Sequence, residues 1–110
     1  VTYSKESKAE LLGIDRDVLD RNDAVSEVVA RAMADGALKR SEADLAFGIT
    51  GFAGPGAPGQ EEGLVHIALA HRDGAAIHCE EHFGKVGRGA VRVKSLKAML
   101  DMLEQAIDEV

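Results

Sequence analysis

The chain has 110 residues, enough for one domain with a single core, and its 45% hydrophobic and 29% charged residues are ordinary for a globular protein. The net charge of −6, without any run of Lys or Arg, argues against a nucleic-acid partner. The single cysteine, Cys79, precludes an internal disulfide and fits a reducing cytoplasm. No apolar run approaches the length of a membrane span, and no signal peptide is visible, so we expect a cytoplasmic domain without a membrane partner.

The first residues predict a strand followed by a helix. Val1–Tyr3 has the character of a strand end, Ser4 is a suitable N-cap, and a helix over Lys5–Leu12 would stop at Gly13. A strand without a turn before it suggests that residues 1–110 form one domain that lacks its opening strand and helix.

A second helix is predicted to begin after Ser26, which is a good N-cap, with Glu27 in the first turn favouring the helix dipole. Apolar residues then recur at helical spacing as far as Lys39 or Arg40. Gly36 inside this helix costs about 1 kcal/mol relative to Ala unless another element packs there.

The central stretch is the first place to look for a ligand site. The apolar run Leu45–Thr50 predicts a strand buried on both faces, as in a parallel sheet. In open α/β sheets ligands bind beyond the carboxyl ends of strands, which directs attention to Thr50 and the loop after it. The alternative is a long flexible surface loop. The loop is rich in residues that allow unusual backbone angles or close ligand approach, namely Gly51, Gly54, Pro55, Gly56, Pro58 and Gly59.

Two strand-like runs, Gly63–His71 and Ala75–Phe83, flank a predicted turn at Arg72-Asp73-Gly74. A two-residue turn would mix polar and apolar residues on both faces. A three-residue turn, with Gly74 in the left-handed conformation, gives one apolar face, and we favour it. Its register pairs Leu69 with Ile77 and Ile67 with Cys79.

The last helix is predicted from Arg88 or Gly89 to Glu109, with a core-facing stripe of Leu96, Met99, Leu100, Leu103, Ile107 and Val110. Together these elements predict an α/β protein, a three-layer α/β/α sandwich with a mixed sheet including one antiparallel hairpin.

Several side chains are candidates for chemistry. His66, His78 and His82, with Glu80, share the second face of the hairpin, but their spread along the strands disfavours a metal site, and surface or inter-subunit positions are expected. Cys79 falls on the apolar face and is expected to be inert.

A second candidate cluster lies near the start of the chain. Tyr3, Ser4 and Lys8 would place a phenol, a hydroxyl and an amine at one end of the sheet, and a desolvated lysine there could act as a base. The alternative is a capped helix with a solvated lysine. Arg88, at the start of the last helix, could bind an anion or be ordinary surface charge.

Four stretches in order along the chain are notable together, and Thr-Gly-x-Ala-Gly-Pro is the most specific of their motifs. They are Val1-Thr2-Tyr3-Ser4 with Lys8 and Leu11-Leu12-Gly13, Ala24-Val25-Ser26-Glu27 with Val29-Ala30, Thr50–Gly56, and Phe83–Arg92. With these stretches the sequence resembles the C-terminal domain of the competence/damage-inducible CinA family, which includes nicotinamide mononucleotide deamidases, and Arg88 and Arg92 stand at the family's arginine positions.

The resemblance implies an amidohydrolase that converts nicotinamide mononucleotide to nicotinate mononucleotide and ammonia. It implies catalytic roles for Tyr3 and Lys8, no metal or other cofactor, a small-molecule nucleotide partner and a homo-oligomer. The family's serine nucleophile lies in a Ser-Cys-Thr-Gly-Gly stretch that residues 1–110 do not contain, so a non-catalytic nucleotide-binding or assembly module is the alternative. The substrate-binding residues implied are Ser4, Thr50, Gly51, Ala53, Gly54 and Arg88.

Overall fold

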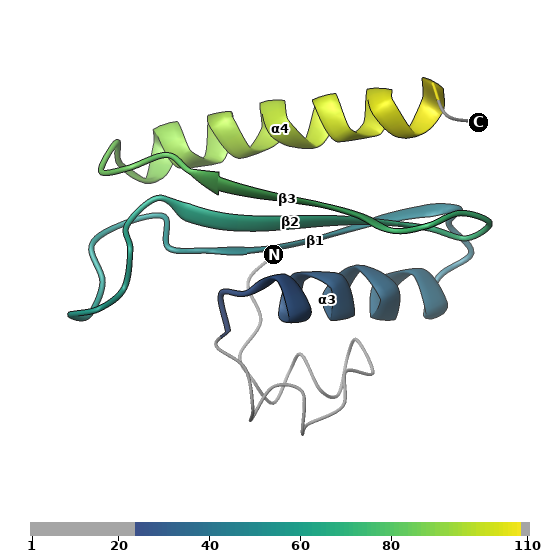
Figure 1. The fold of residues 1–110 in the computed structure, drawn as a ribbon, viewed down its shortest axis with the longest axis horizontal. Helices are drawn as coiled ribbons and strands as arrows, with labels where there is room; N and C mark the ends of the chain where they lie inside the picture. Colours follow the sequence, from purple (N-terminus) through teal and green to yellow (C-terminus); the bar gives the residue numbers. More distant parts are fainter. Residues whose placement is uncertain (1–23, 109–110) are drawn as a thin grey trace.

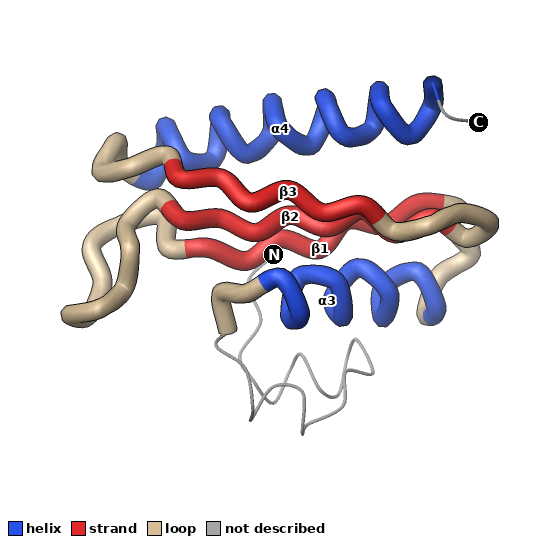
Figure 2. Tube along the Cα trace, in the orientation of Figure 1, coloured by secondary structure: helices blue, strands red, loops and turns tan. Residues whose placement is uncertain are grey.

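The computed structural model describes residues 24–108, in which a three-stranded sheet lies between two helices (Figure 1). Figure 2 shows the layers, with α3 on one face of the sheet and α4 on the other, as the predicted α/β sandwich requires. The expected strand at residues 1–3 and helix at residues 5–12 lie outside the described residues. The elements are α3 (Glu27–Lys39), β1 (Leu45–Gly51), β2 (Leu64–His71), β3 (Ile77–His82) and α4 (Arg88–Asp108).

The described strands run in the order β1-β2-β3, and both pairings are antiparallel. The prediction that β1 belongs to a parallel pairing is therefore wrong for its contact with β2, where Leu45 lies opposite His71 and Gly51 opposite Val65. An apolar run indicates burial on both faces but carries no information on strand direction. The loop over residues 52–63 contains no crossover helix, so it returns the chain antiparallel to β1.

The two faces of the sheet differ in side-chain size. On the face toward α3 the cross-strand pairs are small, with Ala46 opposite Ala70 and Gly48 opposite Ala68. On the face toward α4 they are large, as in the pair of Phe47 and Leu69. Because successive strand residues point to opposite faces, the alternation of small and large residues in β1 produces both surfaces at once.

Helix α3 begins and ends as the sequence predicts. Ser26 is the N-cap, and its hydroxyl accepts a hydrogen bond of 3.3 Å from the amide of Val29. Glu27 pairs with Arg31 one turn later, and Lys39 in the last turn complements the helix dipole. These contacts fix the helix end from which Glu27 reaches the sheet.

Gly48 is the point where α3 comes closest to the sheet. A Cβ atom at this position would lie 2.2 Å from the carbonyl oxygen of Ala30 and 2.6 Å from the amide nitrogen of Ala34. Both obstacles are backbone atoms of a helix, so neither could turn aside as a side chain could. The alanines of α3 and the glycine of β1 together bring helix and strand into direct backbone contact.

We expect Gly48→Ala to destabilise the protein by about 3 kcal/mol, because the added methyl group must push α3 off the sheet. Gly89→Ala is the matched control. Its Cβ would meet nothing within 4 Å, and alanine at this helical position should be neutral or stabilising by up to about 1 kcal/mol. Denaturant unfolding followed by circular dichroism measures both, and equal stability of the two variants would contradict the close-contact explanation.

The hairpin has the predicted register, with Leu69 opposite Ile77 and Ile67 opposite Cys79. The predicted left-handed Gly74 is wrong, because positive φ angles among the described glycines occur elsewhere. β3 starts only at Ile77, so the connection is longer than three residues and does not need that conformation.

Arg72, in the connection between β2 and β3, ties the hairpin to the end of α3. Its guanidinium donates hydrogen bonds to the backbone carbonyls of Leu38, Ser41 and Ala43. It therefore satisfies a carbonyl at the helix C-terminus that has no partner within the helix. The planar guanidinium of arginine can donate to several carbonyls at once, whereas the ammonium group of lysine lacks this geometry.

Helix α4 packs on the sheet through a different face from the one predicted. Its buried residues are Val91, Ser95 and Met102, with Ala98, Met99 and Ala106 packed beside them. Of the predicted stripe, Met99 contacts the core, but Leu96 and Leu100 are each 56% exposed and Ile107 is 61% exposed. The face of α4 that covers the large side chains of the sheet therefore combines small residues with valine and methionine, and Leu96 and Leu100 lie outside it. No helix within residues 24–108 has both the length and the apolar composition needed to cross a membrane.

Candidate functional site

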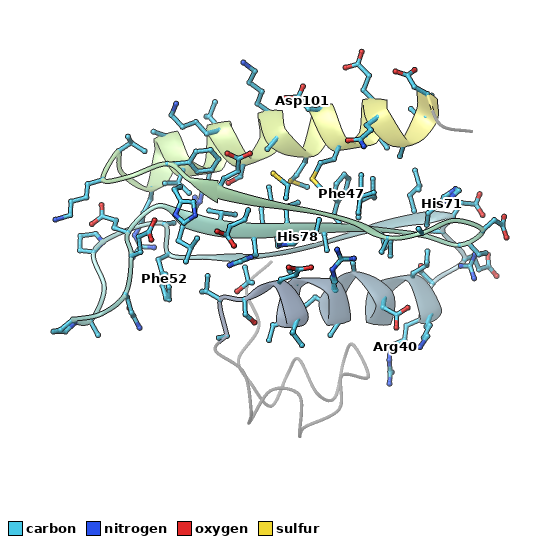
Figure 3. The ribbon with its side chains drawn as sticks, in the orientation of Figure 1. Arg40, Phe47, Phe52, His71, His78 and Asp101 are labelled. Atoms are coloured by element: carbon cyan, nitrogen blue, oxygen red, sulfur yellow. The ribbon has the colours of Figure 1, made fainter. Side chains whose placement is uncertain are left out.

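One end of the sheet gathers the loops that the sequence marks as a site. β1 and β3 both finish there, at Gly51 and His82, and α4 starts there at Arg88. The backbone of Gly63 links the two loops, since its amide donates to Phe52 and its carbonyl accepts from Phe83. Figure 3 labels Phe52 at this end of the molecule and Arg40 at the other.

The backbone arrangement leaves no room for a side chain at Gly63. A Cβ there would lie 2.3 Å from the backbone of Gly84, and both glycines have positive φ angles, +89° and +79°. The loop after β1 and the loop before α4 are therefore in backbone contact.

Thr50 is a buried residue whose hydroxyl already has a partner. The side chain is 9% exposed, and its Oγ1 donates a hydrogen bond of 2.8 Å to the carbonyl of Ala24, just before α3. Thr50 thus connects the segment leading into α3 with the end of β1. Gly51 follows it at the exposed end of the strand, and Ala53 packs against the core cluster beneath α4.

Gly54 and Arg88 are the predicted site residues that the structure places in direct proximity. Gly54 is buried, and a Cβ built on it would lie 2.8 Å from Nε and 3.0 Å from Cζ of Arg88. The absence of a side chain at position 54 therefore lets the guanidinium lie against the loop backbone. Arg88 is itself the first residue of α4, so its charge and the helix N-terminus coincide.

The loop that carries Gly54 is braced by its own polar groups. The amide of Ala57 donates to the side-chain oxygen of Gln60, and the amide of Gln60 donates to the carbonyl of Ala57. These bonds give the loop internal support beyond that expected of a flexible surface loop. Tyr3, Ser4 and Lys8, the other residues predicted for the site, lie outside the described residues.

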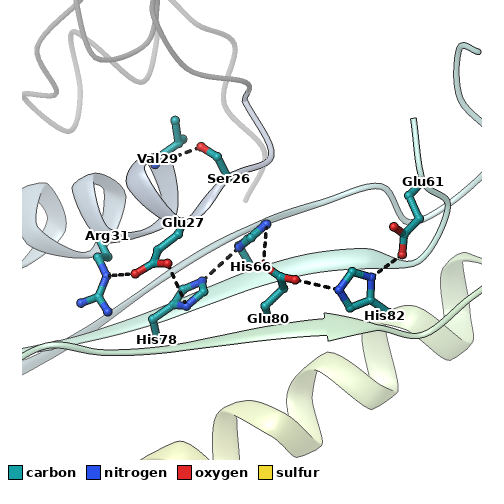
Figure 4. A network of polar contacts seen from close by, with 9 residues as sticks. All are labelled: Ser26, Glu27, Val29, Arg31, Glu61, His66, His78, Glu80 and His82. Atoms are coloured by element: carbon teal, nitrogen blue, oxygen red, sulfur yellow. Dashed lines mark hydrogen bonds and ion pairs between the residues drawn. The ribbon is translucent and has the colours of Figure 1, made fainter. Parts of the chain in front are cut away.

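The three hairpin histidines form a polar network between the sheet and α3 (Figure 4). His66 Nδ1 lies 3.0 Å from His78 Nε2, and the two rings are stacked with centroids 5.2 Å apart. The expected surface position is wrong for His66, which is only 7% exposed, because the small residues on this face of the sheet leave space for imidazoles under α3. The successive members of the network are Glu27, His78, His66, Glu80, His82 and Glu61.

The pKa values of the histidines at the two ends of the network are shifted in opposite directions. Hydrogen bonds with Glu61 and then Glu80 raise the pKa of His82 above its ordinary value. Burial lowers the pKa of His78, and this effect outweighs the nearby charge of Glu27, which raises it. The register reveals the pairing of His66 with Glu80 from sequence alone, but the participation of Glu27 depends on the packing of α3.

The histidine network does not converge on a single point. Each ring nitrogen faces a neighbouring imidazole or carboxylate, and His66 uses its two nitrogens in different directions, toward His78 and Glu80. Within residues 24–108, no group of three or more His, Cys, Asp or Glu side chains could hold a metal ion. A metal hydrolase built on these histidines therefore has no support from the described geometry.

Cys79 lies on the opposite, apolar face, as predicted, and packs against the core beneath α4. Burial, together with a hydrogen bond from its Sγ to Glu81, raises the pKa of the thiol to about 11. The thiol is therefore protonated and unreactive at neutral pH. It borders a groove of about 600 Å³ between β3 and α4, which also contacts Lys94, Lys97 and Asp101 and lies apart from Gly54 and Arg88.

We expect His82 to titrate above 6.5 and His78 below it, measured from the ring C–H resonances by NMR. Charged His82 contributes to the free energy of unfolding at pH values below the pKa that it has in the unfolded chain, and this contribution is lost as the pH rises through its raised pKa in the folded protein. Neutral His78 contributes at pH values above its pKa in the unfolded chain, and this contribution is lost as the pH falls through its lowered pKa in the folded protein.

Glu61→Gln is the matched variant for this titration. It should lower the pKa of His82 and leave that of His78 unchanged, because Glu61 contacts only the first of these rings. Equal pKa values for His78 and His82 in the parent protein would contradict the network.

Known proteins with the same fold and related sequences place this chain in a family. The profile of the CinA C-terminal domain matches residues 1–107. A CinA-like protein of Mycolicibacterium vanbaalenii is 40% identical over 109 residues, covering 97% of this chain and 26% of that protein. A CinA-like protein of Parasynechococcus marenigrum is 37% identical over the same share of each chain.

Solved structures agree with the sequence relatives. The competence/damage inducible protein CihA of Agrobacterium tumefaciens superposes with a TM-score of 0.89 at 39% identity, over 96% of this chain and 65% of that one. A CinA superfamily protein of Klebsiella pneumoniae gives a TM-score of 0.90 at 29% identity, over 100% of this chain and 69% of that one.

These matches define an α/β domain of the competence/damage-inducible class. The chain belongs to the CinA C-terminal domain family. It spans about a quarter of the length of the curated relatives that it matches.

Proposed function

We propose that the chain is part of an amidohydrolase that converts nicotinamide mononucleotide to nicotinate mononucleotide and ammonia. The observation that carries the proposal is the contact of the Arg88 guanidinium with the backbone at Gly54, at the N-terminus of α4. A cation beside a helix N-terminus suits the phosphate of a nucleotide. Membership of the CinA family supports the reaction type.

The roles that we propose for the site residues follow from the chemistry of amide hydrolysis. The reaction needs an activated nucleophile and stabilisation of the oxyanion that forms at the carboxamide carbon. Lys8, if desolvated, would accept the proton of the nucleophile, and Tyr3 would relay a proton or donate to the oxyanion. Backbone amides at Gly51 and beyond would line the pocket, as the resemblance implies, and Ser4 would contribute to binding.

The nucleophile distinguishes this proposal from its alternative. The resemblance puts the nucleophile in a Ser-Cys-Thr-Gly-Gly stretch, which residues 1–110 do not contain, and the second candidate is a nucleotide-binding or assembly module without catalysis. The same contact of Gly54 with Arg88 would serve both functions, because it concerns binding of the phosphate. Catalysis and binding must therefore be measured separately.

The test of catalysis uses the protein as it is encoded, with any residues that precede Val1. We expect mass spectrometry to detect nicotinate mononucleotide from nicotinamide mononucleotide, and Lys8→Ala to abolish its formation. Formation no faster than in the Lys8→Ala variant would reject the amidohydrolase. Tight binding without turnover, measured by isothermal titration calorimetry, would instead identify the binding module.

The test of the phosphate site measures affinity alone. Arg88→Gln should weaken binding of nicotinamide mononucleotide about tenfold, because it removes a charge-assisted hydrogen bond to the phosphate. It should not affect the weaker binding of nicotinamide riboside, which has no phosphate.

Lys85→Gln is the control for loss of one positive charge, since Lys85 is exposed in the same connection between β3 and α4. An equal loss of affinity for nucleotide and nucleoside, or an equal effect of Lys85→Gln, would contradict a specific phosphate contact by Arg88.

A further inference from the structure

Two histidine rings lie against each other in the space between the sheet and α3 (Figure 4). His66 is 7% exposed, and the side chain of His78 is 12% exposed. The rings are stacked at an interplanar angle of 23°, and His66 Nδ1 lies 3.0 Å from His78 Nε2. At this separation one nitrogen donates and the other accepts, so one of the two must be without a hydrogen.

Charged groups flank the pair from α3 and from β3. On α3, Glu27 lies 3.6 Å from His78 Nδ1 and is itself paired with Arg31. On β3, Glu80 lies 3.8 Å from His66 Nε2, whereas β1 contains no charged residue. One positive charge on the pair therefore has a carboxylate on each outer side. Both carboxylates are about half exposed, so solvent weakens their effect on the rings.

The stacked pair can hold one added proton but not two. With one added proton, the two facing nitrogens still form a donor and an acceptor. A second proton places a hydrogen on both nitrogens and brings two positive charges together, with ring centroids 5.2 Å apart. Burial has the largest effect on the pKa of His78 and lowers it, and the charge of His66 lowers it further against the opposing charge of Glu27. The two rings therefore titrate as a coupled unit.

The other contacts of α3 determine which part of the helix would follow a separation of the rings. The middle of the helix touches the sheet at Gly48 through backbone atoms, and its C-terminal end is held by Arg72. The first turn instead meets the sheet at His78, through Glu27. Separation of the rings therefore acts on the first turn, while the middle and the end of α3 keep their contacts.

We propose that the His66–His78 pair is an acid-sensitive switch, in which the second proton separates the two rings and frees the first turn of α3 from the sheet. The release also reaches the candidate site, because Ala24, just before α3, accepts the hydrogen bond of the Thr50 hydroxyl. The proposal does not depend on the proposed function, since it concerns only protonation and the packing of α3.

Hydrogen exchange of the full chain, followed by NMR over a range of pH, tests the switch. The amides of Val29 and Ala30 both donate to Ser26 in the first turn. We expect their protection factors to fall about tenfold per pH unit below the second titration step, because the open form binds one more proton. The amide of Ile67, which is fully buried in β2, should keep its protection. Unchanged protection in the first turn, or an equal loss at Ile67, would overturn the proposal.

Variants that cannot hold the second proton distinguish the pair from other effects of acid. His78→Gln keeps a side chain that can donate or accept, and His78→Phe keeps a ring in the stack, so each should remove the pH dependence of protection in the first turn. His82→Gln is the matched control, because it removes an imidazole that lies beyond Glu80 and outside the pair. It should leave the acid release intact. Acid release that persists in either His78 variant, or that His82→Gln abolishes, would overturn the assignment of the switch to this pair.

Discussion

The contact between α3 and β1 at Gly48 is the constraint on which the described structure depends. Helix and strand approach until backbone meets backbone, and this is possible only because the facing residues are alanine and glycine. The same small residues leave the space in which His66 and His78 stack. The opposite face is filled by large side chains and is covered by the alanines, Val91 and the methionines of α4, while Leu96 and Leu100 of that helix are exposed. One pattern of side-chain size in β1 and β2 thus determines the packing of both helices.

Much of this fold could be predicted from local features of the sequence. Ser26 identified the start of α3, and the alternation of apolar residues fixed the register of β2 and β3, because a shift of one residue would have mixed the faces. The direction of β1 and the orientation of α4 could not be predicted in this way. Both depend on which surface covers which, and helical periodicity does not distinguish a stripe that meets the sheet from a second stripe beside it.

The candidate site was predictable in part. The glycines after Thr50 predicted a ligand site, and Arg88 at a helix start was a candidate for anion binding or for ordinary surface charge. The structure places Gly54 against Arg88. The hydrogen bond that engages the Thr50 hydroxyl was not foreseeable, since its acceptor, Ala24, is 26 residues away in sequence. The burial of His66 was missed for a similar reason, because it follows from the size of residues on neighbouring elements.

The contact of Gly63 with Gly84 has a mechanical consequence. Because these backbones touch and are hydrogen-bonded through Phe52 and Phe83, the glycine loop and the entrance to α4 form one unit. A ligand that shifted the loop at Gly54 would also displace the first turn of α4. Because α4 is a continuous helix, a displacement of its first turn would also move its C-terminal end.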